Sequence, residues 1–185
     1  MTSILGYALL GLLAREPCSG YDLSRKMQKP ISFFWRARHS QIYPELAKLE
    51  AQSLVTYTVV EQQDQPDKKV YTITSAGEDA LRKWVSTPMD VSMLRDELIL
   101  RAYSLWLASP DEARQLFLTH AQLHSEQLNM YEAVLQEMLA ESHIQQVDSP
   151  QFGSYAVLML GIGYERMYSE WCYWVAQQLE HGVTK

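Results

Sequence analysis

The stretch from Ser40 to Gly77 constrains the fold more than any other, because it places a short amphipathic helix directly before a β-hairpin pattern. The helix is predicted from apolar residues at helical spacing, namely Ile42, Leu46 and Leu49. Two runs of β-branched and aromatic residues, 55–60 and 70–74, flank the turn-rich segment 63–67 and predict the hairpin. A helix followed by such a hairpin is typical of a winged helix-turn-helix, a unit that binds DNA.

Other helices are predicted on both sides of this stretch. Residues 4–13 carry a broad apolar stripe that ends before Pro17. The Ser19-Gly-Tyr-Asp22 motif predicts an N-cap with an acid three residues later, and Ser75-x-x-Glu78 predicts a capping box that opens a helix after the hairpin. The expected order in this part of the chain is therefore α-α-α-β-β-α.

Pro44 lies inside the third helical pattern. Proline is tolerated in a first helical turn, so the helix is expected to begin between about Ser40 and Tyr43. Gln41 and Tyr43 then lie near the N-terminal end, the part of a recognition helix that meets base edges. Glutamine can pair with adenine, and tyrosine can reach a phosphate or a thymine methyl group. A core-facing Tyr43 is the alternative.

The net charge of −6 is unevenly distributed along the chain. Residues 1–90 carry 11 basic and 10 acidic side chains, whereas residues 91–185 carry 5 and 12. The window 25–48 has a net charge of +5. Such a patch supplies the phosphate contacts that DNA binding requires, although a charged helix surface can also be merely solvated. The basic residues of this window are Arg25, Lys26, Lys29, Arg36, Arg38 and Lys48.

The second half of the chain is predicted to be helical. Thr87-Pro88 marks a linker, so the expected domains are residues 1–88 and 89–185. One amphipathic helix is expected from Leu94 to Trp106, a longer one over 111–141, and a third after Ser149-Pro150. The long helix carries an apolar seam with heptad spacing, made of Phe117, Ala121, His124, Leu128, Tyr131, Leu135 and Met138. The predicted fold is therefore mainly α, with an α+β winged helix-turn-helix followed by three helices that form a homodimer.

Several motifs, taken in combination, resemble those of the PadR family of bacterial transcriptional regulators. The most specific are Gln41-Ile-Tyr-Pro44 and the Tyr71-x-Ile-Thr74-x-x-Gly77 exit from the hairpin. The other matching residues are Ile4-Leu-Gly6, Leu12-Leu13, Ser19-Gly-Tyr21, Phe34-Trp35, Leu46, Leu49-Glu50 and Leu54-Val55. The resemblance covers about residues 1–88 and implies a repressor that binds a pseudo-palindromic operator in double-stranded DNA.

Two positions depart from the family pattern. Ser40 stands where glycine is common, and the wing reads Gln65-Pro-Asp-Lys-Lys69 where members commonly have Arg-Pro followed by basic residues. Lys68 and Lys69 are therefore the expected phosphate contacts of the wing. The expected DNA-binding residues are Arg25, Lys26, Arg36, Arg38, Ser40, Gln41, Tyr43, Pro44, Lys48, Lys68 and Lys69. A winged helix that binds a protein partner and no DNA remains the alternative.

Aromatic side chains crowd the last predicted helix beside one cation, a mixture typical of pockets for aromatic acids. Members of the PadR family respond to phenolic acids or planar lipophilic compounds, so the resemblance implies a small aromatic effector. The candidate effector-binding residues are His124, Tyr164, Arg166, Tyr168 and Trp171. The alternative is that these residues form the core of a dimer interface.

Motifs for catalysis, metals and cofactors are incomplete in the sequence. His120 and His124 have i, i+4 spacing, but the glutamate of a zinc hydrolase and a third ligand are missing. The pair Gly161 and Gly163 is followed by Arg166 at the third glycine position of the dinucleotide fingerprint. The expectation is therefore a binding protein, not an enzyme, with no metal and no cofactor.

The cysteines and the N-terminus bear on the cellular compartment. Cys18 and Cys172 lie far apart, without the pattern of a secreted disulfide domain. The apolar N-terminal stretch lacks a basic leader and is shorter than the ~20 residues of a membrane span. A cytoplasmic protein without a membrane anchor is expected.

Overall fold

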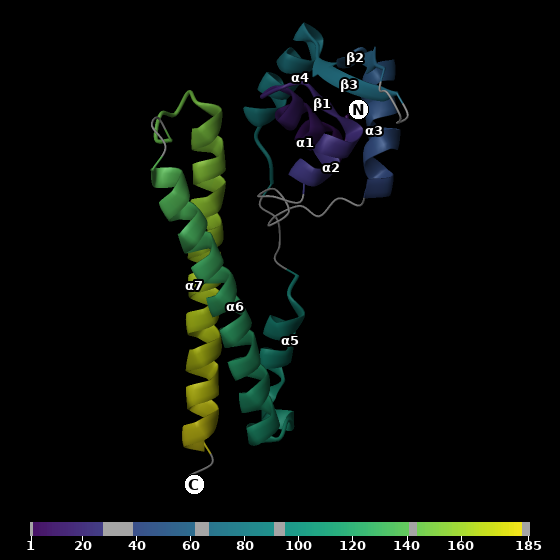
Figure 1. Ribbon diagram of the computed structural model, residues 1–185. Coiled ribbons are helices and arrows are strands. Elements are labelled where there is room, and N and C mark those ends of the chain that lie inside the picture. Colours follow the sequence, from purple (N-terminus) through teal and green to yellow (C-terminus); the bar gives the residue numbers. More distant parts are fainter. Residues whose placement is uncertain (1, 28–38, 62–66, 91–94, 141–143, 183–185) are drawn as a thin grey trace. The chain divides into compact units, whose positions relative to one another are not determined.

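The computed structural model describes residues 2–27, 39–61, 67–90, 95–140 and 144–182. The chain divides into two compact units, Met1–Asp90 and Val91–Lys185. In the described residues, the strands belong to the first unit, where helices pack against a small sheet, and the second unit is helical (Figure 1). This arrangement confirms the predicted fold class, mainly α with an α+β N-terminal part.

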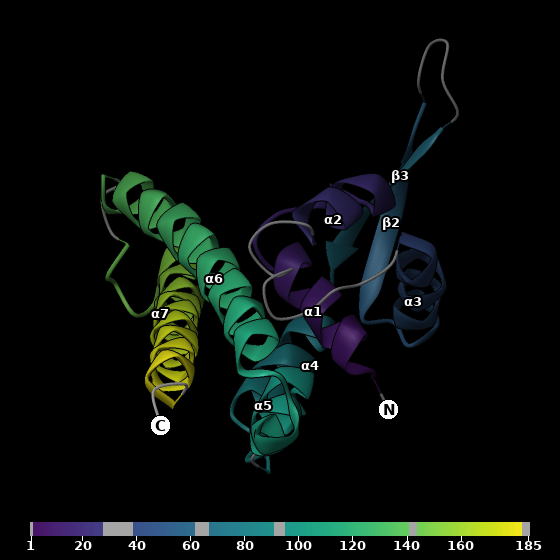
Figure 2. The ribbon, with the colours of Figure 1, turned by 90° about the horizontal axis from the view of Figure 1, so that it is seen from below.

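The first unit has the element order of a winged helix-turn-helix. Its elements are α1 (Ile4–Leu13), β1 (Cys18–Ser19), α2 (Gly20–Lys26), α3 (His39–Ala51), β2 (Val55–Val60), β3 (Lys68–Ile73) and α4 (Ser75–Val85). The antiparallel sheet has the order β1-β3-β2, so β3 pairs on both sides. Figure 2 shows the β2–β3 hairpin projecting from the helices of its unit.

An apolar core joins the helices of this unit to the sheet. Ser3 caps α1, and its hydroxyl accepts a hydrogen bond from the Gly6 amide at 3.0 Å. The fully buried core side chains are Leu9, Leu10, Leu23, Ile42, Leu46 and Leu49. The inward face predicted for α3 from its periodicity is thereby confirmed.

Three local predictions for this unit were wrong. Helix α3 already includes His39, so Pro44 lies in its second turn, where it has no backbone N–H to donate a hydrogen bond to the Ser40 carbonyl. The N-cap of α4 is Thr74, not Ser75, because Thr74 has extended backbone angles and its hydroxyl accepts from the Gly77 amide at 3.1 Å. Strand β1 was missed because two residues carry no period-2 signal.

The second unit consists of α5 (Glu97–Tyr103), the 3-10 helix η2 (Leu105–Leu107), α6 (Pro110–Leu139) and α7 (Pro150–Gly182). Helices α6 and α7 lie side by side over most of their length (Figures 1 and 2). The single helix expected from Leu94 to Trp106 is instead interrupted at Ser104, and Leu94 lies outside the described residues.

The heptad seam predicted on α6 is buried or half-buried at all seven positions. Phe117 and Ala121 pack with Leu98 of α5 and with Tyr168 and Cys172 of α7. Further along, Tyr131 packs with a second group on α7, Leu158 and Ile162. Regular spacing along α6 therefore supplies a continuous contact surface for α7.

Candidate functional site

Helix α3 exposes the side chains that the sequence predicted to contact DNA. They are Ser40, Gln41, Tyr43, Pro44 and Lys48. Tyr43 is 45% exposed, which excludes its core-facing alternative. The helix thus presents an amide, an aromatic ring and a cation on the side opposite its buried residues.

The ring of Tyr43 lies directly against the backbone of Gly20, the first residue of α2. A Cβ atom at Gly20 would lie 2.6 Å from Cε1 and 3.0 Å from Cζ of Tyr43. Only glycine leaves room for this close approach. Gly20 therefore helps to fix where the Tyr43 ring sits on the exposed surface.

Glu45 connects α3 to Ser3, the residue that caps α1. It is 6% exposed, and its Oε1 accepts a hydrogen bond from the Ser3 hydroxyl at 2.6 Å. Its Oε2 forms an ion pair with Lys48 Nζ at 3.2 Å. Since Lys48 is 66% exposed at the side chain, its ammonium remains accessible to a phosphate.

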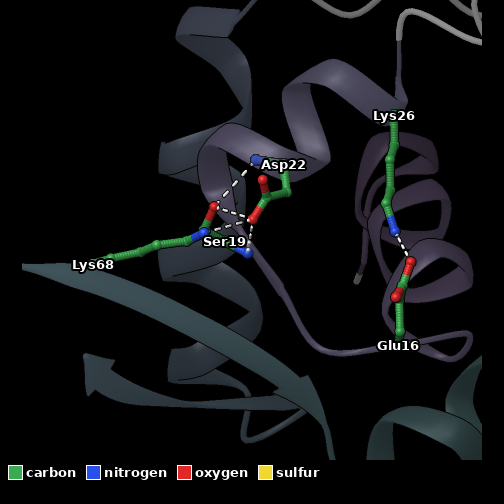
Figure 3. Close-up of polar contacts among 5 residues, drawn as sticks. All are labelled: Glu16, Ser19, Asp22, Lys26 and Lys68. Atoms are coloured by element: carbon green, nitrogen blue, oxygen red, sulfur yellow. Dashed lines mark hydrogen bonds and ion pairs between the residues drawn. The ribbon is translucent and has the colours of Figure 1, made fainter. Parts of the chain in front are cut away.

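Both lysines of the wing contact partners within the first unit. Lys68 Nζ lies 3.0 Å from Asp22 Oδ2, and Lys69 Nζ lies 3.8 Å from the centroid of the Tyr57 ring. The Asp22 carboxylate also accepts bonds from the Ser19 hydroxyl and amide, at 2.6 and 3.2 Å (Figure 3). The Ser19 hydrogen bond, followed by Lys68, lowers the pKa of Asp22 to about 2.

Two of the remaining basic candidates, Arg25 and Lys26, lie on α2. Lys26 forms an ion pair with Glu16 (Figure 3), and the Arg25 side chain is exposed. Arg36 and Arg38 lie outside the described residues. Lys26, Lys48 and Lys68 thus each pair with an acid in the free chain, so a phosphate contact at these positions replaces an existing ion pair.

In the second unit, four of the five effector candidates form one aromatic cluster. The ring centroids of His124 and Tyr168 are 4.2 Å apart, and those of Tyr164 and Tyr168 are 5.4 Å apart. Trp171 meets Tyr168 edge-on at 5.5 Å. Arg166 is not part of the cluster, because its guanidinium pairs with Glu132 of α6 at 2.7 Å.

Acidic side chains complete this aromatic cluster. His124 Nδ1 pairs with Glu165, and both side chains are largely buried. The hydroxyl of Tyr168 donates to Asp96 Oδ2 at 2.6 Å, while Asp96 Oδ1 caps α5 through the Leu98 amide at 2.8 Å. Burial, reinforced by the bond to Asp96, raises the pKa of Tyr168, whereas that hydrogen bond lowers the pKa of Asp96 despite its burial.

Histidines, cysteines and long helices are the other features of the described residues that bear on binding. His120 and His124 stack with centroids 6.5 Å apart, and no group of three or more potential metal ligands is found among the described residues. None of the described helices is long and apolar enough to cross a membrane. Cys18 and Cys172 are both buried free thiols.

The sequence did not identify several residues that organise these sites. The sequence carried no signal for the contacts that Gly20, Glu45, Asp96 and Glu165 make. Asp22 was recognised as the acid of a capping motif, and that part is confirmed by the capping box at Ser19. Its contact with the wing depends on the pairing of β1 with β3, which the sequence pattern does not reveal.

Comparison with known proteins identifies both halves of the chain. Residues 9–83 match the transcriptional regulator PadR-like family, and residues 94–180 match the virulence activator alpha C-terminal family. Over 169 residues the chain is 34% identical to the negative transcriptional regulator PadR of Bacillus subtilis, covering 91% of this chain and 93% of that protein.

Solved structures agree with this match. Bacillus subtilis PadR in complex with operator DNA has a TM-score of 0.86 and 31% identity, over 96% of this chain and 99% of that chain. The same protein in complex with p-coumaric acid has a TM-score of 0.82 and 31% identity, with the same coverage. The Vibrio cholerae virulence activator AphA has a TM-score of 0.75 and 25% identity, over 96% of this chain and 98% of that chain. The chain therefore belongs to the PadR family of transcriptional regulators.

Proposed function

We propose that this chain is a transcriptional repressor that binds an operator in double-stranded DNA as a homodimer. The observation that carries the proposal is the surface of α3, where Gln41 and Tyr43 are exposed above a fully buried apolar face. Its whole-chain similarity to Bacillus subtilis PadR, solved with operator DNA, supports the same use of this surface. Gln41 and Tyr43 read base edges, while Lys48, Lys69 and Arg25 contact phosphates.

A second apolar seam on α7 supports the dimer. It consists of exposed apolar residues spaced three, four, three and seven positions apart, namely Val157, Leu160, Tyr164, Met167 and Trp174. Exposed apolar surface of this extent is typical of a protein interface, and heptad spacing is what a partner helix requires. A second copy of the chain covers the seam, and the dimer places two recognition helices about 34 Å apart, one turn of DNA.

The aromatic cluster around His124 and Tyr168 is the proposed effector site. Bacillus subtilis PadR has been solved with p-coumaric acid, which supports a small aromatic ligand for this relative. Tyr164 and Trp171 supply ring surfaces, and Arg166 lies outside the cluster. A ligand bound here releases the repressor only if it binds the DNA-free dimer geometry more tightly than the operator-bound one.

The chemistry of the protein is binding alone, and its place is the cytoplasm, where bacterial operators are accessible. The regulator family to which the chain belongs supports this. The proposed mechanism uses DNA, a second copy of the chain and an effector.

Selection of binding sites from random duplex DNA tests the proposed function. The wild-type protein is expected to enrich one pseudo-palindromic site and to bind it saturably in a mobility-shift titration. Gln41→Ala is expected to relax the preference at one base position by about ten-fold, as for a lost base contact. Failure to enrich any site would instead favour a winged helix that binds a protein partner.

A further inference from the structure

The first turn of α2 touches both parts of the proposed DNA-reading surface. At Gly20 its backbone supports the Tyr43 ring on α3, and at Asp22 its carboxylate holds Lys68 at the start of β3. These two contacts come from residues only two positions apart. One short turn is therefore in contact with the recognition helix and with the wing.

The turn is itself held in place by its own hydrogen bonds. Ser19 Oγ accepts from the Asp22 amide at 3.1 Å, and Asp22 Oδ2 accepts from the Ser19 amide at 3.2 Å, which closes a capping box. Ser19 also pairs with Val70 in the β1–β3 ladder. Because Asp22 is fixed by its own turn, Lys68 must come to it, and β3 is joined to the Ser19–Asp22 turn at both Lys68 and Val70.

The contact at Gly20 affects where the Tyr43 ring lies, and therefore which base it can reach, more than it affects the stability of the fold. A methyl group at residue 20 would displace the Tyr43 ring, since the two would lie 2.6 Å apart. The ring is 45% exposed, so it borders solvent on one side, and alanine is a better helix residue than glycine. Gly20→Ala therefore moves a reading side chain while leaving the fold intact or more stable.

We propose that the Ser19–Asp22 turn sets the recognition helix and the wing in register for DNA, with Gly20 and Asp22 as positioning residues. The inference rests on the proposed DNA-binding function. Base contacts need both elements in their places at once, whereas phosphate contacts carry no sequence information and tolerate small shifts. The turn therefore governs the ratio of operator affinity to random-DNA affinity.

The test measures that ratio for a site that the wild-type protein selects from random DNA. Gly20→Ala is expected to lower affinity for the selected site about ten-fold, as for a misplaced base contact, with random-DNA affinity and thermal stability not reduced. Asp22→Asn is expected to lower the ratio several-fold. Simple removal of a negative charge would instead raise both affinities equally and leave the ratio unchanged.

Double mutants show through which contact each single substitution acts. In a Tyr43→Ala background, Gly20→Ala is expected to cause no further loss of the ratio, because the ring it displaces is gone. In a Lys68→Gln background, Asp22→Asn is likewise expected to be silent. Lys68→Gln alone breaks the same ion pair without touching the α2 cap, and it keeps the test valid if Asp22→Asn unfolds.

Glu16→Gln is the matched control, because it breaks the ion pair with Lys26 and contacts neither Tyr43 nor the wing. It is expected to leave the ratio unchanged. If the wild type selects a site and Gly20→Ala and Lys68→Gln both keep its ratio, the inference is overturned and the proposed function stands. If the wild type selects no site, the proposed function fails and the inference falls with it.

Discussion

The two units distribute polar and apolar side chains in opposite ways. In the first, an apolar core is enclosed and the ion pairs of the lysines lie at the surface. Each of these lysine side chains is at least 33% exposed. In the second, Tyr168 and Asp96 bond in the interior, while large apolar side chains face outward. Among the described residues, 16 exposed large apolar side chains belong to the second unit and 8 to the first, so the second is the one that needs a partner.

This inversion fits the functions proposed for the two units. A DNA-facing surface has to exchange its ion pairs for phosphates, so weak, solvated pairs suit it. A dimerising unit instead buries apolar area against its copy, and interior hydrogen bonds hold its helices in one arrangement. Substitutions of surface polar residues are therefore expected to affect DNA binding in the first unit, and substitutions of interior polar residues to affect folding in the second.

The largest expected effect comes from charging the exposed seam of α7. Leu160→Glu combined with Met167→Glu would place two carboxylates per chain in the dimer interface without a cation to pair them. Dissociation to monomers is expected in light scattering, with operator affinity lower on the order of 100-fold, because the two half-sites are no longer bound together. Val147→Glu, a charge on a side chain 78% exposed before α7, is the control. A double variant that remains dimeric would refute this interface.

The next largest effect is expected in the interior of the second unit. Tyr168 is 3% exposed and donates to Asp96, so Tyr168→Phe leaves a carboxylate without its hydroxyl partner. A loss of about 2 kcal/mol in the free energy of unfolding is expected for a hydrogen bond to a charged group. Chemical denaturation measures it, with Tyr164→Phe, a partly exposed neighbour, expected to change stability by less than about 0.5 kcal/mol. Equal effects of the two variants would contradict the interior role of the Asp96 bond.

The features that could be predicted from the sequence are those with local periodicity. The buried face of α3 and the seam of α6 follow from residue spacing alone, because a regular helix fixes which side chains share a side. The break at Ser104 escaped detection because apolar residues continue at nearly helical spacing into η2.

The organisation of the candidate site could be predicted less well. Gln41, Tyr43 and Lys48 were identified because exposure on α3 follows from the position of its buried residues. The contacts of Gly20 with Tyr43 and of Asp22 with Lys68 join segments that are distant in sequence, and they exist only after α2, α3 and the sheet have packed. Such contacts leave no trace in composition or periodicity.

A smaller effect is expected from the exposed polar residues of the first unit. Lys48→Ala removes a cation that is 66% exposed, so the free energy of unfolding is expected to change by less than about 0.5 kcal/mol. Affinity is expected to fall equally on the selected site and on random DNA, with a salt slope smaller by about 1. Fluorescence anisotropy at several salt concentrations measures both quantities. A selective loss on the selected site would assign Lys48 to base reading instead.

The smallest expected effects are changes in the pKa values of two carboxylates, Asp22 in the first unit and Asp96 in the second. Asp22 has a pKa of about 2 against an ordinary 3.8, so its charged form stabilises the fold above pH 3.8, and this stabilisation is lost as pH falls through about 2. In carboxyl-carbon NMR titrations, Ser19→Ala is expected to raise this pKa more than Lys68→Gln does, since the serine bond is the larger cause. Burial raises the pKa of Asp96, and the Tyr168 hydroxyl is the largest of the contacts that lower it, ahead of the Ile99 and Leu98 amides, so Tyr168→Phe is expected to raise the pKa of Asp96 and to leave that of Asp22 unchanged. An Asp22 that titrates at its ordinary value in the wild type would show that the capping turn does not hold the carboxylate, and the contrast between the two units would then lie in their apolar surfaces alone.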